Sequence, residues 1–183
     1  MKNIFASEKI KVIDIAKLSL GGYLLYMGLN FIASMLIVFG GIKIYGWQIR
    51  ERMLPFVDKN ILNLSSNFNI GIIAFVIVLI IPLIEEILFR GLLQSYLMET
   101  IKAKSSEFLQ KYKNLIVIIS TATIYALLTV ALFGGFNKIL PIFVFGLIAS
   151  AITIKSKSLY PAIIFHILKN LSWIIIEIFL FKL

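Results

Sequence analysis

The chain has 183 residues, of which 60% are hydrophobic, and it carries a formal net charge of +9 without a single cysteine. Because a soluble domain is usually about 45–50% apolar, lipid is the expected solvent for this chain. The lack of cysteine excludes disulfides, thiolate nucleophiles and thiolate metal sites. The basic residues gather in polar segments between apolar runs, a pattern that fits the positive-inside rule better than nucleic-acid binding.

The apolar runs predict an all-α fold, a polytopic transmembrane helical bundle of about five spans that forms one membrane domain over residues 1–183. Residues 18–44 are the first predicted span, which is too long for the core of a signal peptide. A polar stretch at 46–69 follows and is expected to lie on the membrane surface. The other predicted spans cover residues 70–97, 115–134, 139–154 and 159–181.

The distribution of lysine and arginine predicts the orientation of this multi-pass protein in the cell membrane. With a cytoplasmic N-terminus, ten basic residues would lie on the cytoplasmic side and six on the other, which favours this orientation. The ten are Lys2, Lys9, Lys11, Lys17, Lys102, Lys104, Lys111, Lys113, Lys155 and Lys157, and the six are Lys43, Arg50, Arg52, Lys59, Lys138 and Lys182.

The second predicted span contains three charged residues in the segment LIEEILFRGLL. Each charge costs about 2.5–3.5 kcal/mol at the bilayer centre. Glu86 and Arg90 have the spacing and order of a helical ion pair, whereas Glu85 points about 100° away and is expected to face a cavity. Two alternatives stay open: the cluster is solvated at the interface, or Pro82 ends the helix early and leaves the acids in a loop.

The fifth predicted span carries a polar stripe that includes the only histidine of the chain. His166 and Asn170 are four residues apart and share a helix face, which Trp173 and Glu177 continue, while Lys169 lies on its flank. A polar stripe on a membrane helix is expected to face the interior of the bundle. Hydrogen bonding between helices is the alternative for His166 and Asn170. Glu177 lies near the end of the span, where an interfacial role is expected.

The segments EEILFRG, and HILKN preceded by LYPA, together resemble the CAAX protease and bacteriocin-processing (Abi) family, which includes type II CAAX prenyl endopeptidase-like intramembrane proteases. The resemblance covers residues 70–172. The family has a Glu-Glu-x-x-x-Arg motif, a Phe-x-x-x-His motif and a His-x-x-x-Asn motif. The first maps onto Glu85, Glu86 and Arg90, and the third maps onto His166 and Asn170.

The second motif departs from the family pattern in the segment STATIYALLTVALFGG. Tyr125 takes the position of the phenylalanine and Thr129 takes that of the histidine, and both are expected on the substrate-binding side of the site. Threonine can hydrogen-bond a carboxylate or a water, but it cannot take up a proton. We therefore expect a slower enzyme, or none.

The resemblance implies an endopeptidase in which a glutamate activates water and no cofactor takes part. Glu85 would be the general base, supported by Glu86 and Arg90, while His166 and Asn170 would donate to the tetrahedral intermediate. The expected substrate is a peptide or protein at the bilayer, in bacterial leader-peptide processing or bacteriocin self-immunity.

Other chemistries are excluded or left open by residue type. One histidine excludes an H-E-x-x-H zinc site, and an aspartyl dyad is not expected because Asp14 and Asp58 lie outside the predicted spans. A metal held by Glu85, Glu86 and His166 stays open as a lesser alternative.

Two functions without proteolysis also stay open. The first is a catalytically impaired relative that acts as a membrane binding, immunity or regulatory protein. The second is a small transporter that uses Glu85 in proton coupling, although five spans without a repeat speak against it.

Overall fold

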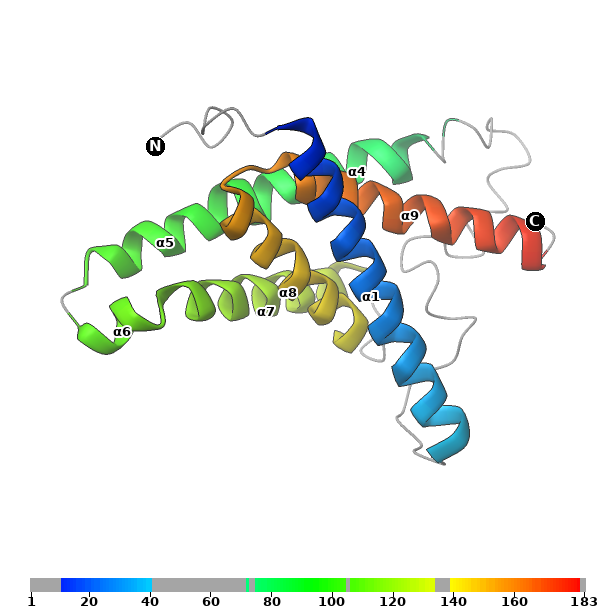
Figure 1. Cartoon of the computed structure of the whole chain (residues 1–183), viewed down its shortest axis with the longest axis horizontal. Coiled ribbons are helices and arrows are strands. Elements are labelled where there is room, and N and C mark those ends of the chain that lie inside the picture. Colours follow the sequence, from blue (N-terminus) through cyan, green and yellow to red (C-terminus); the bar gives the residue numbers. More distant parts are fainter. Residues whose placement is uncertain (1–10, 41–71, 73–74, 105, 134–138, 182–183) are drawn as a thin grey trace.

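The computed structural model of the chain describes residues 11–40, 72, 75–104, 106–133 and 139–181, and every element in this part is a helix (Figure 1). The all-α prediction is confirmed. The surface stretch expected at 46–69 lies outside the described residues. The elements are α1 (Val12–Gly40), the π-helix η2 (Val76–Ile80), α4 (Ile81–Glu86), the π-helix η3 (Ile87–Leu93), α5 (Gln94–Lys102), α6 (Glu107–Lys111), α7 (Lys113–Phe133), α8 (Ile139–Ser156) and α9 (Tyr160–Phe181).

Three of the described helices are long and apolar enough to cross a membrane, in the segments Val12–Ile32, Lys113–Leu132 and Ile139–Ser156. The fourth apolar segment, Tyr160–Ile175, is shorter. The predicted second span is built from successive π and α segments, η2 to α5, instead of one long α-helix. α1 begins at Val12, earlier than predicted, which places Asp14 in its first turn instead of outside the span.

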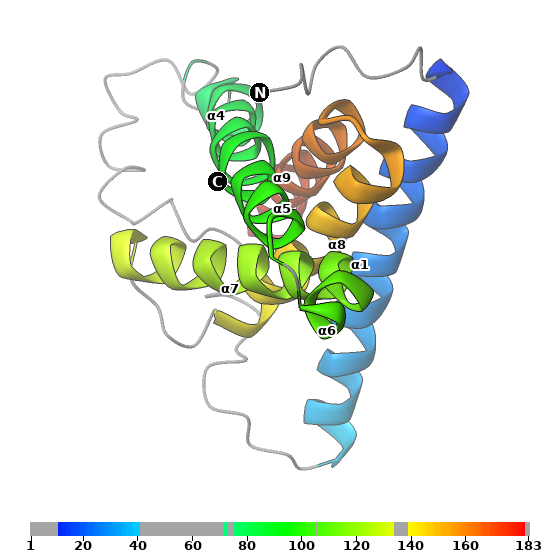
Figure 2. The same ribbon diagram turned by 90° about the vertical axis from the view of Figure 1, so that its left-hand side faces the viewer.

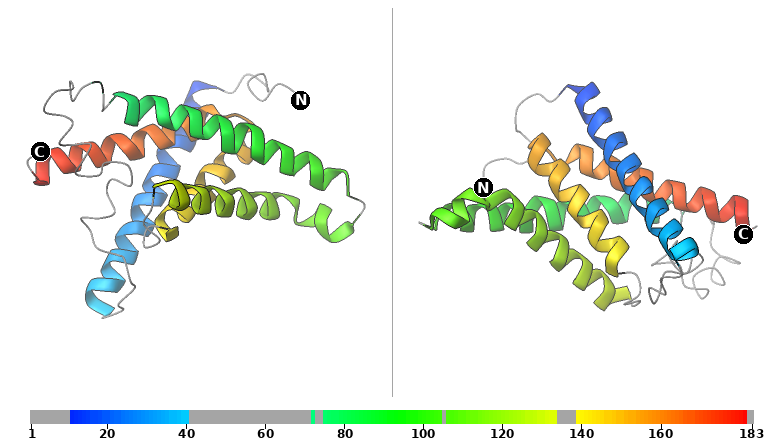
Figure 3. Two further views of the ribbon diagram at one scale, coloured as in Figure 1. Left: turned by 180° about the vertical axis from the view of Figure 1, so that it is seen from behind. Right: turned by 60° about the horizontal axis from the view of Figure 1, so that its bottom comes forward.

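α8 is the central helix of the bundle, since it contacts α1, α7, α9 and η3. Figure 2 shows α1 at one side and the α4–α5 run at the other, with α8 and α9 between them. The views in Figure 3 show α7 running beside α8. A Cβ on Gly146 of α8 would lie only 3.0 Å from the Cα of Ala122 on α7, so the two helices approach closely at this point.

Aromatic side chains join α1 to the rest of the bundle. The ring of Tyr26 meets those of Phe145 and Phe165 edge-on, with centroids 6.0 and 6.1 Å apart. The hydroxyl of Ser19 lies 3.0 Å from the carbonyl oxygen of Pro161 at the start of α9. The helix α1 is therefore part of the same core that carries α8 and α9.

Two π-helical segments flank the acidic pair. The Ile81 N–H donates to the Val76 carbonyl, five residues back, as does the Gln94 N–H to the Phe89 carbonyl. Such wide turns are frequent at functional sites and relieve the clash that a proline ring makes in an ordinary helix. The helix continues through Pro82, so the alternative that Pro82 leaves the acids in a loop is wrong.

Candidate functional site

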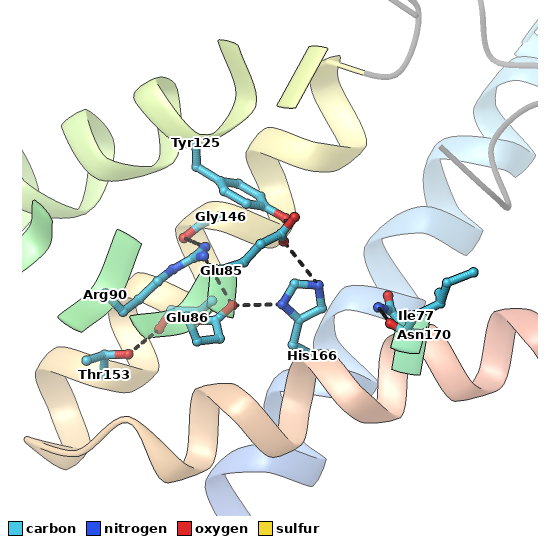
Figure 4. A network of polar contacts seen from close by, with 10 residues as sticks. Ile77, Glu85, Glu86, Arg90, Tyr125, Gly146, Thr153, His166 and Asn170 are labelled. Atoms are coloured by element: carbon cyan, nitrogen blue, oxygen red, sulfur yellow. Dashed lines mark hydrogen bonds and ion pairs between the residues drawn. The ribbon is translucent and has the colours of Figure 1, made fainter. Parts of the chain in front are cut away.

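Two neighbouring carboxylates of α4 meet the imidazole of α9 inside the bundle (Figure 4). His166 Nδ1 lies 2.9 Å from Glu86 Oε1, and His166 Nε2 lies 3.7 Å from Glu85 Oε2. Glu86 and His166 are 80 residues apart in the chain. The charged segment of the second predicted span and the polar stripe of the fifth therefore face each other, as expected of a common site.

Glu86 forms the predicted ion pair with Arg90. Arg90 Nη1 donates to Glu86 Oε1 at 3.1 Å, and both side chains are fully buried. Arg90 Nη2 also lies 3.4 Å from the carbonyl oxygen of Gly146 on α8. Since a lone buried charge is strongly unfavourable, this pairing is what allows Glu86 to remain inside the protein. The alternative of a cluster simply solvated at the membrane interface is wrong for Glu86 and Arg90.

The contact with Glu86 favours one tautomer of the neutral histidine ring. Glu86 Oε1 accepts the hydrogen bond of Arg90, and it accepts a second one when His166 Nδ1 carries the proton. In a neutral imidazole the other nitrogen then has a free lone pair. In this tautomer Nε2, which faces Glu85, is a hydrogen-bond acceptor.

Glu85 is held from the opposite side by Tyr125 of α7. The Tyr125 hydroxyl donates to Glu85 Oε2 at 2.9 Å. The Glu85 side chain is 13% exposed, whereas that of Glu86 is 0% exposed. Of the two carboxylates, Glu85 is therefore the one that a reactant can reach.

Thr129 lies one turn after Tyr125 on α7, and both residues are buried. Residues four apart share a face of a helix, so Thr129 lies on the side of α7 that carries the Tyr125 contact. The structure thus places the two predicted substrate-binding residues on the inner face of α7, with Tyr125 in direct contact with Glu85.

Asn170 does not point at the carboxylates. Its Nδ2 donates to the carbonyl oxygen of Ile77 in η2 at 3.0 Å, and Figure 4 shows it on the far side of His166 from Glu85. In the π-helical pattern that carbonyl would pair with the N–H five residues later, but this residue is Pro82, which has none. Asn170 therefore supplies a donor that the local backbone lacks.

Lys169 borders the site without joining an ion pair among the described contacts. Its Nζ lies 4.1 Å from the centre of the Phe145 ring, and that ring lies 4.4 Å from the ring of His166. Lysine over an aromatic face is a favourable arrangement away from water. Trp173 is half-buried farther along α9, and the side chain of Glu177 lies outside the described residues.

Two further buried polar contacts, both made with backbone carbonyls of α8, were not predicted from the sequence. Gln94 is buried, and its Nε2 donates to the carbonyl oxygen of Ser150 at 3.1 Å. Its spacing, four residues after Arg90 and eight after Glu86, is a signal that would have identified it. The carbonyl of Gly146 has no such signal, because it depends on where α8 packs.

Among the described residues, no group of three His, Asp or Glu side chains is arranged to hold a metal ion. The two nitrogens of His166 face different carboxylates, and Glu86 Oε1 is already shared with Arg90.

Comparison with protein families gives a match to the type II CAAX prenyl endopeptidase Rce1-like family over residues 67–172, more than half of the chain. Neither a curated protein nor a solved structure matches the chain. The matched residues contain both carboxylates, Arg90, Tyr125 and His166, and they agree with the resemblance found in the sequence at 70–172. The chain therefore belongs to the type II CAAX prenyl endopeptidase Rce1-like family.

Proposed function

We propose that the protein is an intramembrane endopeptidase in which Glu85 activates a water molecule. The observation that carries this proposal is the 3.7 Å separation of Glu85 Oε2 and His166 Nε2, two groups from distant helices. One water can lie within hydrogen-bond reach of both, about 2.6–3.2 Å from each. Membership of a CAAX-type protease family supports the same reaction class.

In the proposed reaction, the two O–H groups of this water donate to Glu85 and to the free lone pair of His166 Nε2. Glu85 takes one proton as the water oxygen attacks the carbonyl carbon of the peptide bond. The C–N bond of the resulting tetrahedral intermediate then breaks, and the proton passes from Glu85 to the leaving amine. The enzyme returns to its starting state.

Glu86 and Arg90 support this reaction without touching the substrate. Their ion pair provides the acceptor that holds Nδ1–H of His166, so Nε2 keeps its lone pair toward Glu85. A buried carboxylate that orients a histidine in this way is a known device for fixing the tautomer of a catalytic ring.

The proposed substrate is a peptide or protein that reaches the site from the bilayer. The site packs against α7 and α8, two of the helices that are long and apolar enough to span a membrane, which supports this route. We propose a bacterial cell-membrane role of the leader-peptide or bacteriocin self-immunity type, with no cofactor and no nucleic-acid partner. A prenylated peptide is the alternative substrate class.

The test uses purified full-length protein in liposomes with two probes, an unmodified membrane-anchored peptide and a farnesylated peptide with a C-terminal CAAX sequence. Products are identified by mass spectrometry. Glu85→Gln and His166→Gln should each lower the rate at least about 100-fold, as expected when a general base or its partner is removed. The matched control is Glu107→Gln, at an exposed position of α6, which should leave the rate unchanged. Full cleavage by Glu85→Gln would overturn the proposal.

The proposed orientation, with the N-terminus in the cytoplasm, has its own test. The native chain has no cysteine, so single cysteines can be placed without background. Lys104→Cys and Lys155→Cys, both exposed, should react with a membrane-impermeant maleimide only from the cytoplasmic side. Arg50→Cys should react only from the opposite side, and the reverse pattern would invert the orientation.

A further inference from the structure

Tyr125 is placed to act on Glu85 and not only to fill the core. The tyrosine lies on α7, 40 residues from Glu85 in the chain, yet its hydroxyl donates to Glu85 Oε2 at 2.9 Å. Its side chain is only 2% exposed. A hydrogen bond to a carboxylate is among the stronger ones available to a neutral donor. In a buried apolar setting it fixes the direction of that carboxylate.

The ring that carries this hydroxyl is itself held on several sides. It meets the ring of Phe89 edge-on with centroids 4.9 Å apart, and it lies against Phe145 at 5.8 Å. The Arg90 guanidinium carbon lies 4.6 Å from the ring centre. A donor at the end of a clamped ring loses little further freedom when it bonds, which is what a positioning group needs.

The contacts of Glu85 also distinguish its two oxygens. The Tyr125 hydroxyl and His166 Nε2 both approach Oε2, at 2.9 and 3.7 Å. We infer that Tyr125 is a positioning residue that anchors Glu85 through Oε2, the oxygen nearest His166 Nε2, and thereby holds the carboxylate beside the reacting water. This inference rests on the proposed function, and it differs from the expectation that Tyr125 binds the substrate.

The two roles of Tyr125 give different kinetics in the liposome assay. If the hydroxyl positions Glu85, Tyr125→Phe should lower kcat about 10- to 100-fold with KM changed less than about twofold, because one hydrogen bond to a charged group is lost. If Tyr125 binds the substrate, KM should rise while kcat stays the same. The matched control is Tyr96→Phe, which removes a hydroxyl from an exposed tyrosine of α5.

A second measurement checks the contact without any substrate. Thermal unfolding in detergent is compared for Tyr125→Phe, Glu85→Ala and the double variant. Because the two residues interact directly, the double variant should be less destabilised than the sum of the single variants. Additive effects would show that the contact does not form and would overturn the inference.

The outcomes also separate this inference from the proposed function. If Glu85→Gln is inactive while Tyr125→Phe keeps the kcat of the wild type, the protease proposal stands and the role of Tyr125 falls. If Glu85→Gln cleaves as well as the wild type, the protease mechanism itself falls. A rise in KM alone in Tyr125→Phe would return Tyr125 to substrate binding.

Discussion

Asn170 of α9 donates to the carbonyl oxygen of Ile77 at 3.0 Å, and this is the carbonyl whose partner five residues later, Pro82, has no N–H. A side chain of one helix thus completes the hydrogen bonding of another. In a membrane no water is available to hydrogen-bond a backbone carbonyl, so such a donor contributes more to stability than it would at a protein surface. The contact also ties α9, which carries His166, to the run that carries Glu85.

We predict that Asn170→Ala lowers stability more than it lowers the chemical rate. The loss of the Ile77 contact should cost about 1–3 kcal/mol of unfolding free energy, because it leaves a part-buried carbonyl without a partner in a membrane protein. The rate constant kcat should fall by less than about tenfold. Thermal unfolding in detergent and cleavage in liposomes measure the two effects. A loss of about 100-fold or more in kcat at unchanged stability would instead mean that Asn170 donates to the reaction intermediate.

The Arg90–Glu86 pair should be far more sensitive to the loss of one partner than to the loss of both. Arg90→Met leaves Glu86 buried without its cationic partner, which should destabilise the protein by about 3–5 kcal/mol. The double variant Glu86→Leu with Arg90→Met should recover much of that stability, yet it should remain slow in cleavage because His166 loses its anchor.

The control for this pair is Lys102→Met. Lys102 and Glu99 form an ion pair of 2.9 Å whose side chains are 50% and 74% exposed. Removing the lysine should change stability by about 0–1 kcal/mol. Equal effects of Lys102→Met and Arg90→Met on the unfolding midpoint would contradict the prediction.

Gly146 should tolerate no large side chain. Its position against Ala122 leaves no room for one, so Gly146→Leu should cost at least about 1–3 kcal/mol by overpacking and should push α7 and α8 apart. Gly28 of α1 has nothing within 4 Å of its ideal Cβ, which makes Gly28→Leu the matched control. Unfolding in detergent measures both, and a Gly146→Leu protein as stable as the control would refute the close approach.

Thr129→His should raise the activity of the protein. The new imidazole would lie on the same inner face of α7 as Tyr125 and would add a group that can take up a proton, which threonine lacks. We expect a gain in kcat of at least about tenfold, measured in the liposome assay. Thr123→His, on an exposed part of the same helix, is the control and should have no effect. A well-folded Thr129→His protein without any gain would count against the general-base scheme.

The sequence predicted the parts of the site that follow from helical spacing. The spacing of four from Glu86 to Arg90 sufficed to predict their ion pair, and the charges within an apolar run favoured a functional site there. It also predicted an all-α membrane protein of this family. The family motifs indicated that His166 would meet the carboxylates.

Other features depend on packing that spacing does not reveal. Glu85 accepts a hydrogen bond from Tyr125, and Arg90 lies within reach of the Gly146 carbonyl. Both contacts depend on how α7 and α8 pack against the helices from η2 to α5. The sequence did not predict that Asn170 donates to the carbonyl of Ile77. This carbonyl lacks a backbone partner only because the π-helical pattern would pair it with Pro82, which has no N–H. The helix boundaries also differ from the prediction, since α1 begins at Val12, before the apolar run that predicted the first span from residue 18.

The distance along the chain between Glu86 and His166 has a consequence for how the protein is made. The ribosome synthesises Glu86 80 residues before His166. The helices from η2 to α5 therefore enter the bilayer while Glu86 has only Arg90 as a partner. During synthesis the carboxylates therefore lack their contact with His166 until α9 has been made. The cluster that joins Glu85, Glu86 and His166 is therefore complete only once α9 has been inserted.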